Sequence, residues 1–287
     1  MSVILIGPSG VGKTTLLTTM LQHGATSLEL NPTPETQTEL EQLEQQWLLI
    51  HQHANFKPLA PLLLPTSAPN RYSFAHKTLE LIIEDTVGNQ LNDNEFIPEI
   101  QSKTVIITVI DAAALMETQP QPQANSLLSV FQEALTTSQK RLIIFALTKA
   151  ETWLKTTSLS QQLHHAFEQH YQPVLAWLET TAHVVALYLP VNTLGCVEFS
   201  HIVGHGRQQQ LIFVKKANLS CQPSRVEQVL CYSLAFILKY YQPRQHFWEK
   251  LGFAPQTTKS RQLSRELLVS QCDPKVNLYG NTTLLEQ

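Results

Sequence analysis

Residues 7–14 read Gly-Pro-Ser-Gly-Val-Gly-Lys-Thr, which matches the pattern G-x-x-x-x-G-K-S/T at every fixed position. In such a loop the backbone N–H groups wrap around the charged tail of a nucleoside triphosphate. Lys13 is then expected to reach the β- and γ-phosphates, and the Thr14 hydroxyl is expected to bind Mg²⁺. The residues predicted to line this loop are Gly7, Pro8, Ser9, Gly10, Val11, Gly12, Lys13, Thr14 and Thr15.

An Asp-x-x-Gly sequence lies farther along the chain, where Asp85 follows an apolar run and Gly88 comes three residues later. In proteins with a phosphate-binding loop, an aspartate after such a strand holds Mg²⁺, often through water. A glycine leaves room for a backbone N–H to approach the γ-phosphate. We therefore predict that Asp85 shares the metal with Thr14 and that Gly88 contacts the phosphate. The alternative is a turn at a strand end, in which the aspartate only caps the backbone.

A third candidate, Thr148-Lys149-Ala150-Glu151, directly follows the apolar run 142–147. It resembles the guanine-recognition motif of GTPases, N/T-K-x-D, in which the lysine stem lies along the base and the carboxylate accepts two hydrogen bonds from guanine. Adenine has no matching pair of donors, so a buried carboxylate discriminates against it. Glu151 is one methylene longer than the usual aspartate, which leaves the choice between GTP and ATP open. A Lys-x-Glu surface turn at a helix start is the alternative.

Taken in chain order, these three motifs and the sequence Val-Asn-Thr-Leu-Gly at 191–195 resemble those of the Ras-like class of P-loop GTPases. More narrowly, the chain is similar to the bacterial double-GTPase family over about residues 1–240. The details in common are a long segment before the second strand, the pair Pro65-Thr66, the sequence Val-x-Asp-Ala-Ala at 109–113 and the loop at 191–195.

The resemblance also implies roles for residues outside the three motifs. Asn192 and Thr193 fall in the loop that GTPases place against the guanine oxygen. Thr66 is the candidate for the switch threonine that closes on Mg²⁺ and the γ-phosphate, with Thr33 as a weaker competitor. Many GTPases place a water-orienting glutamine directly after Asp-x-x-Gly, but here the shorter Asn89 stands there and Gln90 follows, so hydrolysis is expected to be slow or partner-dependent. The expected catalytic residues are Lys13, Thr66, Asn89 and Gln90, and the expected metal ligands are Thr14, Asp85 and Thr66.

The motifs need elements that position them, and apolar runs alternate with helical patterns along most of the chain. Strands that are apolar throughout are typical of parallel sheets whose two faces are both covered. We predict an α/β fold, a three-layer P-loop NTPase sheet that is mostly parallel with one antiparallel edge strand. Strands are predicted at 2–6, 71–75, 78–83, 104–110, 142–147 and 183–189, a hairpin insert at 196–214, and helices at 34–52, 126–137, 160–180 and 224–241.

The chain length of 287 residues suggests one large domain, which we place at 1–241 as a P-loop GTPase-like domain. Residues 242–287 are predicted to form a C-terminal extension that is peripheral or partly disordered. A formal net charge of −3 argues against nucleic-acid binding through bulk electrostatics. No stretch approaches the roughly 20 apolar residues that cross a bilayer, and the apolar start is too short for a signal peptide. We therefore expect a cytoplasmic protein without a membrane span.

The cysteines and histidines give no sign of a metal centre. The four cysteines are scattered and include no C-x-x-C pair, so we predict reduced thiols and neither disulfides nor a zinc site. The histidine pairs lack the H-E-x-x-H pattern and are expected on the surface or in packing roles. The cysteines are Cys196, Cys221, Cys231 and Cys272.

Together, the residues and the resemblance imply a GTP-binding molecular switch with Mg²⁺-dependent GTP hydrolysis. The implied partners are a guanine nucleotide and a protein, either another GTPase or an effector. One alternative is an ATPase or nucleotide kinase on the same sheet, although the arginine-rich lid of a kinase is not evident. A second alternative is a scaffold that binds nucleotide without hydrolysing it.

Overall fold

A computed structural model gives the fold of the chain. None of the helices within the part that it describes combines the length and the apolarity needed to span a bilayer. The described residues are 2–24, 28, 30–52, 70–76, 79–87, 96–118, 123–204, 210–217, 220–241 and 269–285.

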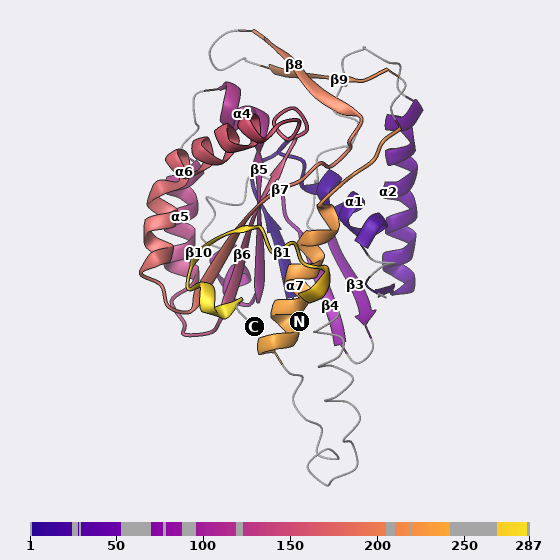
Figure 1. Cartoon of the computed structure of the whole chain (residues 1–287). Helices are drawn as coiled ribbons and strands as arrows, with labels where there is room; N and C mark the ends of the chain where they lie inside the picture. Colours follow the sequence, from indigo (N-terminus) through magenta and orange to yellow (C-terminus); the bar gives the residue numbers. More distant parts are fainter. Residues whose placement is uncertain are drawn as a thin grey trace.

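The centre of the molecule is an eight-stranded sheet with the order β10-β7-β6-β5-β1-β4-β3-β2 (Figure 1). The five strands from β7 to β4 are parallel, while β10 at one edge is antiparallel to β7, and β3 is antiparallel to both β4 and β2. The predicted mostly parallel sheet with an antiparallel edge strand is confirmed. The strands are β1 (Ser2–Ile6), β2 (Asn31–Pro32), β3 (Asn70–His76), β4 (Leu79–Asp85), β5 (Val105–Asp111), β6 (Arg141–Thr148), β7 (Val184–Pro190) and β10 (Asn277–Gly280).

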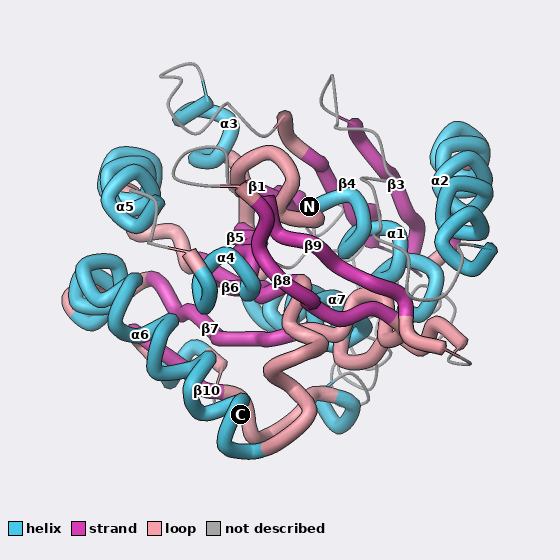
Figure 2. Tube along the Cα trace, turned by 90° about the horizontal axis from the view of Figure 1, so that it is seen from above, coloured by secondary structure: helices cyan, strands magenta, loops and turns pink. Residues whose placement is uncertain are grey.

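Helices cover both faces of the sheet, which gives the predicted three layers (Figure 2). Alternate strand residues serve the two faces, so that Val3 joins the core with α1, α2 and α7, and Ile4 joins the core with α3 to α6. This explains why the strands are apolar without alternation. The helices are α1 (Lys13–Gly24), α2 (Pro34–Gln52), α3 (Ile97–Gln101), α4 (Ala112–Glu117), α5 (Gln123–Ala134), α6 (Thr157–Glu179), α7 (Val226–Tyr240) and the 3₁₀ helix η4 (Thr282–Leu284).

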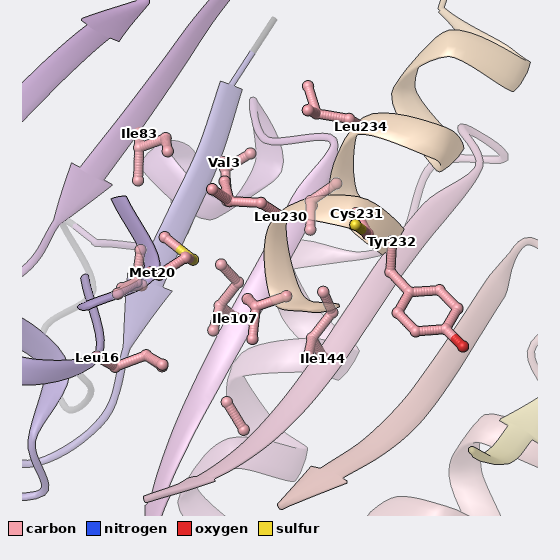
Figure 3. Packing of buried hydrophobic residues seen from close by; sticks show 14 of the residues in the cluster. Val3, Leu16, Met20, Ile83, Ile107, Ile144, Leu230, Cys231, Tyr232 and Leu234 are labelled. Atoms are coloured by element: carbon pink, nitrogen blue, oxygen red, sulfur yellow. The ribbon is translucent and has the colours of Figure 1, made fainter. Parts of the chain in front are cut away.

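The packing of α7 closes one face of the sheet, as its run of apolar residues predicts. Leu230 of α7 belongs to the same buried cluster as Ile107 of β5 and Ile144 of β6, and all three side chains are fully buried (Figure 3). Burying an aliphatic side chain of this size contributes roughly 1.5–3 kcal/mol. The helix and the strands that carry the site therefore form one rigid core.

The last described segment belongs to this sheet. Residues 277–280 form β10 and pair with β7, and the Tyr240 hydroxyl at the end of α7 donates a hydrogen bond to the Leu284 carbonyl at 2.7 Å. The C-terminal segment thus supplies an edge strand of the sheet. The domain boundary at residue 241 stays a prediction.

A separate two-stranded sheet, β8 (Val197–Val203) and β9 (Gln210–Lys215), lies beyond the edge at which the parallel strands end (Figures 1 and 2). This is the predicted hairpin insert. Cys196 and Cys221 form a disulfide at its base, so the prediction that all four cysteines are thiols is wrong for this pair. The pairing comes from the return of the chain after β9, which a separation of 25 residues does not reveal. Cys231 and Cys272 are free thiols.

Candidate nucleotide-binding site

The predicted motifs meet at the edge of the sheet where the parallel strands end. The register pairs Asp85 of β4 with Leu5 of β1, and Asp111 of β5 with Thr148 of β6. Asp85, Asp111 and Thr148 are each the last residue of their strand. Loops after parallel strands converge at this edge, which is where such sheets bind ligands. The sheet topology therefore brings together motifs that are far apart in the sequence.

The loop of residues 7–12 joins β1 to α1 by a path that requires glycine. Gly7 has a φ of 147°, and a Cβ atom there would lie 2.6 Å from the Val109 carbonyl oxygen. Gly12 has a φ of 95°, and a Cβ atom there would lie 3.4 Å from the Thr148 Oγ1 atom. Residues that carry a side chain rarely adopt such positive φ values. The glycines thus let the loop pass close to the ends of β5 and β6.

Lys13 begins α1 and has only 6% of its surface exposed. Its Nζ donates hydrogen bonds to the carbonyl oxygens of Gly7 at 2.8 Å and Pro8 at 3.0 Å. Burial lowers the pKa of Lys13, and the nearby Asp85 charge opposes that shift. A dehydrated ammonium group inside a curled loop favours an anionic ligand. This geometry suits the predicted contact with phosphates.

Thr14 and Asp85 lie together on the same side of the loop. The Thr14 hydroxyl donates a hydrogen bond to Asp85 Oδ2 at 3.1 Å, and the Asp85 side chain is fully buried. The end of β4 is fixed by the Thr86 hydroxyl, which donates to the Leu5 carbonyl at 2.7 Å. Mg²⁺ prefers oxygen ligands and is commonly held by one or two protein groups together with substrate phosphates. The hydroxyl and carboxylate oxygens here fit such an ion.

Tyr72 of β3 is a neighbour of Asp85 that the sequence motifs do not identify. Its side chain is 1% exposed. Burial is the main cause that raises the pKa of Tyr72 to about 12, and the negative charge of Asp85 adds to it. The phenol therefore stays neutral beside the carboxylate at physiological pH.

Thr148 and Lys149 connect the third motif to the phosphate loop. The Thr148 hydroxyl contacts the carbonyl oxygens of Val11 and Ile110, the latter at 3.2 Å. Lys149 has a φ of 54°, and its Nζ donates to the Gly10 carbonyl at 2.7 Å. A left-handed backbone at a residue other than glycine costs about 1–2 kcal/mol. The surrounding contacts offset that cost and direct the lysine stem back over the loop.

Asp111 is a second neighbour of the site that has no role in the sequence prediction. It ends β5, and its Oδ1 accepts a hydrogen bond from the Ala114 N–H at 3.0 Å, which caps α4. Its Oδ2 forms an ion pair with Lys149 Nζ. One carboxylate thus fixes both the start of α4 and the position of the lysine. Its place at the end of an apolar strand is the sequence signal that marks it.

Glu151 lies against the loop that follows β7. Its Oε1 accepts hydrogen bonds from the Thr193 hydroxyl at 3.2 Å and from the Leu194 N–H at 3.1 Å. Burial raises the pKa of Glu151, and these hydrogen bonds oppose the shift. The Asn192 backbone exchanges hydrogen bonds with Ser224, at 3.0 Å and 2.9 Å. Glu151, Asn192 and Thr193, which the sequence predicts at the base, therefore lie in one cluster.

Four predicted site residues lie outside the described part of the chain, and their roles stay predictions. They are Thr66, Gly88, Asn89 and Gln90.

Thr33, the weaker candidate for the switch threonine, is described. It accepts a hydrogen bond from the Thr36 N–H at 3.4 Å near the start of α2, as a helix cap does.

Three features define the architecture: the glycine-rich loop between β1 and α1, the parallel sheet, and the helices on both of its faces. The chain has a P-loop NTPase fold. No protein-family model matches the sequence, and no curated protein matches it.

Several solved structures are similar in fold. A mammalian SRP receptor structure has 11% identity and a TM-score of 0.41, covering 67% of this chain and 92% of that chain. The S. cerevisiae Ski7 GTPase-like domain bound to GTP has 16% identity and a TM-score of 0.43, covering 67% of this chain and 42% of that chain. The bacterial elongation factor EF-Sec has 16% identity and a TM-score of 0.38, covering 67% of this chain and 25% of that chain.

Proposed function

We propose that this chain binds GTP with Mg²⁺ at the edge of its sheet and hydrolyses it slowly or on contact with a partner, as a molecular switch. The observation that carries the proposal is the direct bonding between motifs that are far apart in the sequence. Lys149 Nζ donates to the Gly10 carbonyl of the phosphate loop, and Glu151 accepts from the loop after β7. These contacts support the proposal because they link the groups proposed to bind the phosphates with those proposed to bind the base.

The phosphate half of the proposal rests on the loop of residues 7–12. Its backbone N–H groups and the positive end of α1 would receive the phosphate oxygens. Lys13 would turn from the carbonyls that it now contacts toward the β- and γ-phosphates. Thr14 and Asp85 would hold Mg²⁺, which, when bound, neutralises charge on the phosphate oxygens.

The base half of the proposal rests on Lys149 and Glu151. The lysine stem would lie along the ring, and the carboxylate would accept hydrogen bonds from the guanine N1–H and amino group. Adenine lacks this pair of donors, so the site would prefer GTP to ATP. The hydrogen bonds from Thr193 and Leu194 hold the Glu151 carboxylate in the loop region, which supports its use in place of the shorter aspartate.

In the proposed hydrolysis, water attacks the γ-phosphorus and the bond to the β-phosphate oxygen breaks, which gives GDP and inorganic phosphate. Thr66, Asn89 and Gln90 are proposed to order the attacking water and the γ-phosphate. We propose that the segments around them change between the two nucleotide states and that a protein partner, another GTPase or an effector, recognises this change. The proposed setting is the cytoplasm.

The test is a calorimetric titration of the whole chain with GTP and with ATP, each with Mg²⁺, together with Glu151→Ala. We expect tighter binding of GTP in the wild type and loss of that preference in Glu151→Ala. Glu133→Ala, which changes an exposed carboxylate on α5, is the matched control and should behave as the wild type. Equal affinity of the wild type for GTP and ATP would contradict the GTP assignment and favour the ATPase alternative.

A further inference from the structure

We propose that Phe213 in the β8–β9 hairpin is a positioning residue for Lys149, so that the hairpin determines how tightly the base of the nucleotide is held. The proposal rests on the proposed function, because Lys149 is taken to lie along the base. It adds a specificity role to a hairpin that belongs to none of the nucleotide motifs.

The hairpin lies where a base would be bound. β8 begins at Val197, directly after the loop of residues 192–196 that contacts Glu151. Both Figure 1 and Figure 2 place β8 and β9 across the ends of the parallel strands. The hairpin and the candidate site therefore occupy the same side of the sheet.

The hairpin is attached to the segment that carries Lys149. The Phe199 N–H in β8 donates to the Thr152 hydroxyl at 3.0 Å, and the Phe199 ring stacks on Trp153 with centroids 5.9 Å apart. Glu198 forms ion pairs with Lys155 and Lys216, the latter at 3.1 Å. These contacts fix the hairpin relative to residues 148–155.

The base of the hairpin is also closed across its two ends. The Cys196–Cys221 disulfide joins the residue before β8 to the segment after β9, and the Lys216 N–H donates to the Cys196 carbonyl at 2.8 Å. Gly195, with a φ of 74°, passes so close to Gln222 that a Cβ would lie 2.1 Å from the Gln222 carbonyl oxygen. The chain entering the hairpin and the chain leaving it are thus held together.

Phe213 of β9 contacts Lys149 through the face of its ring. Lys149 Nζ lies 5.4 Å from the Phe213 ring centroid, within the range of a cation–π interaction. Phe213 is itself held edge-on by Phe199, with centroids 6.0 Å apart. The aromatic series Trp153, Phe199 and Phe213 therefore starts just after the third motif and returns to its lysine.

The ammonium of Lys149 thus has three fixed neighbours, the Gly10 carbonyl, the Asp111 carboxylate and the Phe213 ring. The first two belong to the floor of the site at the ends of the parallel strands, and the ring comes from the hairpin alone. Removing the ring frees the ammonium on that side and lets the long stem sample more rotamers. A mobile stem gives a poorer surface for the base and leaves the phosphate contacts unchanged.

The experiment measures the affinity for GTP and for inorganic tripolyphosphate, both with Mg²⁺, in four forms of the whole chain. Phe213→Leu removes the aromatic face, and Phe213→Tyr keeps it. Leu211→Ala is the control, since Leu211 lies two residues earlier on the same face of β9 and is not aromatic. We expect Phe213→Leu to weaken GTP binding by about two- to fivefold, with tripolyphosphate unchanged and the other two variants like the wild type.

A Phe213→Leu variant that binds GTP as tightly as the wild type would overturn the proposal. So would equal weakening of GTP and tripolyphosphate, because that result indicates a packing role. A wild type that binds neither ligand, or binds both equally, would instead refute the proposed function itself.

A second measurement keeps the proposal testable without any ligand. The Lys149 ε-CH₂ protons should show an upfield ring-current shift in the wild type and in Phe213→Tyr. We expect that shift to disappear in Phe213→Leu. An unchanged shift in Phe213→Leu would mean that the ring does not face the ammonium.

Discussion

The phosphate side and the base side of the candidate site differ in how they are built. The phosphate side consists of residues 7–14 together with Asp85, and Lys13 is held by carbonyls only five and six residues away. The base side consists of residues 148–153, the loop at 192–196 and the β8–β9 hairpin. Its contacts join residues about forty positions apart, such as Thr193 with Glu151.

The two sides therefore depend on different features of the chain, the phosphate side on local sequence and the base side on long-range contacts. The phosphate loop follows from glycine conformations and a strand–helix junction, which a short sequence determines. The base side needs a disulfide, a pair of backbone hydrogen bonds between Asn192 and Ser224, and a series of aromatic contacts. Changes on the phosphate side should therefore affect every triphosphate ligand. Changes on the base side should affect only ligands that carry a base.

The largest effect is expected on the phosphate side. Lys13→Ala removes the buried ammonium, and we expect the affinities for GTP and for tripolyphosphate both to fall by about 100-fold or more, the cost of deleting one partner of a buried charge pair. The control is Lys140→Ala, which removes an exposed lysine. Calorimetry measures both. Retained tripolyphosphate binding in Lys13→Ala would break the distinction between the two sides.

The next effect concerns the disulfide on the base side. Reducing Cys196–Cys221, whose partners are 25 residues apart, should lower the free energy of unfolding by about 3 kcal/mol, because the unfolded chain regains loop entropy. GTP binding should weaken while tripolyphosphate binding stays constant. Chemical denaturation with and without reductant measures the first change, with Cys221→Ser as the non-reducible reference. Cys272→Ser is the control that keeps the disulfide, and it should remain sensitive to reductant. Identical denaturation midpoints of the wild type with and without reductant would contradict the prediction.

A smaller effect is expected in how the preference for GTP over ATP, a property of the base side, changes with pH. The pKa of Glu151 is raised above its ordinary value of 4.5 by burial, so the folded state takes up a proton at a higher pH than the unfolded chain. The ionised carboxylate that accepts from guanine is present above that raised pKa and is lost as the pH falls through it. We expect the preference for GTP over ATP to decline over this window, whereas Glu151→Ala should show no such decline. A preference that is constant down to pH 4.5 would argue against the carboxylate as the base-selective group.

Much of the fold could be predicted from the sequence, because the signals are local. The apolar runs at 104–110 and 142–147 correspond to β5 and β6 within a residue or two. The loop at 7–14 could be placed because its glycines, lysine and threonine have fixed spacings. Asp85 could be paired with Thr14 because both follow from motifs whose relative position the parallel sheet determines.

The remaining features depend on contacts that no local pattern encodes. Cys196 meets Cys221 only after β9 returns along β8, and β10 reaches β7 from the far end of the chain. The sequence pattern around Phe213 is that of an ordinary strand, and its contact with Lys149 is evident only in the folded structure. Such features arise from the tertiary arrangement and become visible only in the folded structure.

GTP binding at this edge of the sheet is tested by a crystal structure of the whole chain with a non-hydrolysable GTP analogue and Mg²⁺. We expect phosphates within the loop at 7–12, the metal beside Thr14 and Asp85, and the guanine along Lys149 with the Glu151 carboxylate facing its N1–H. An empty loop, or a Glu151 carboxylate turned away from the base, would contradict it.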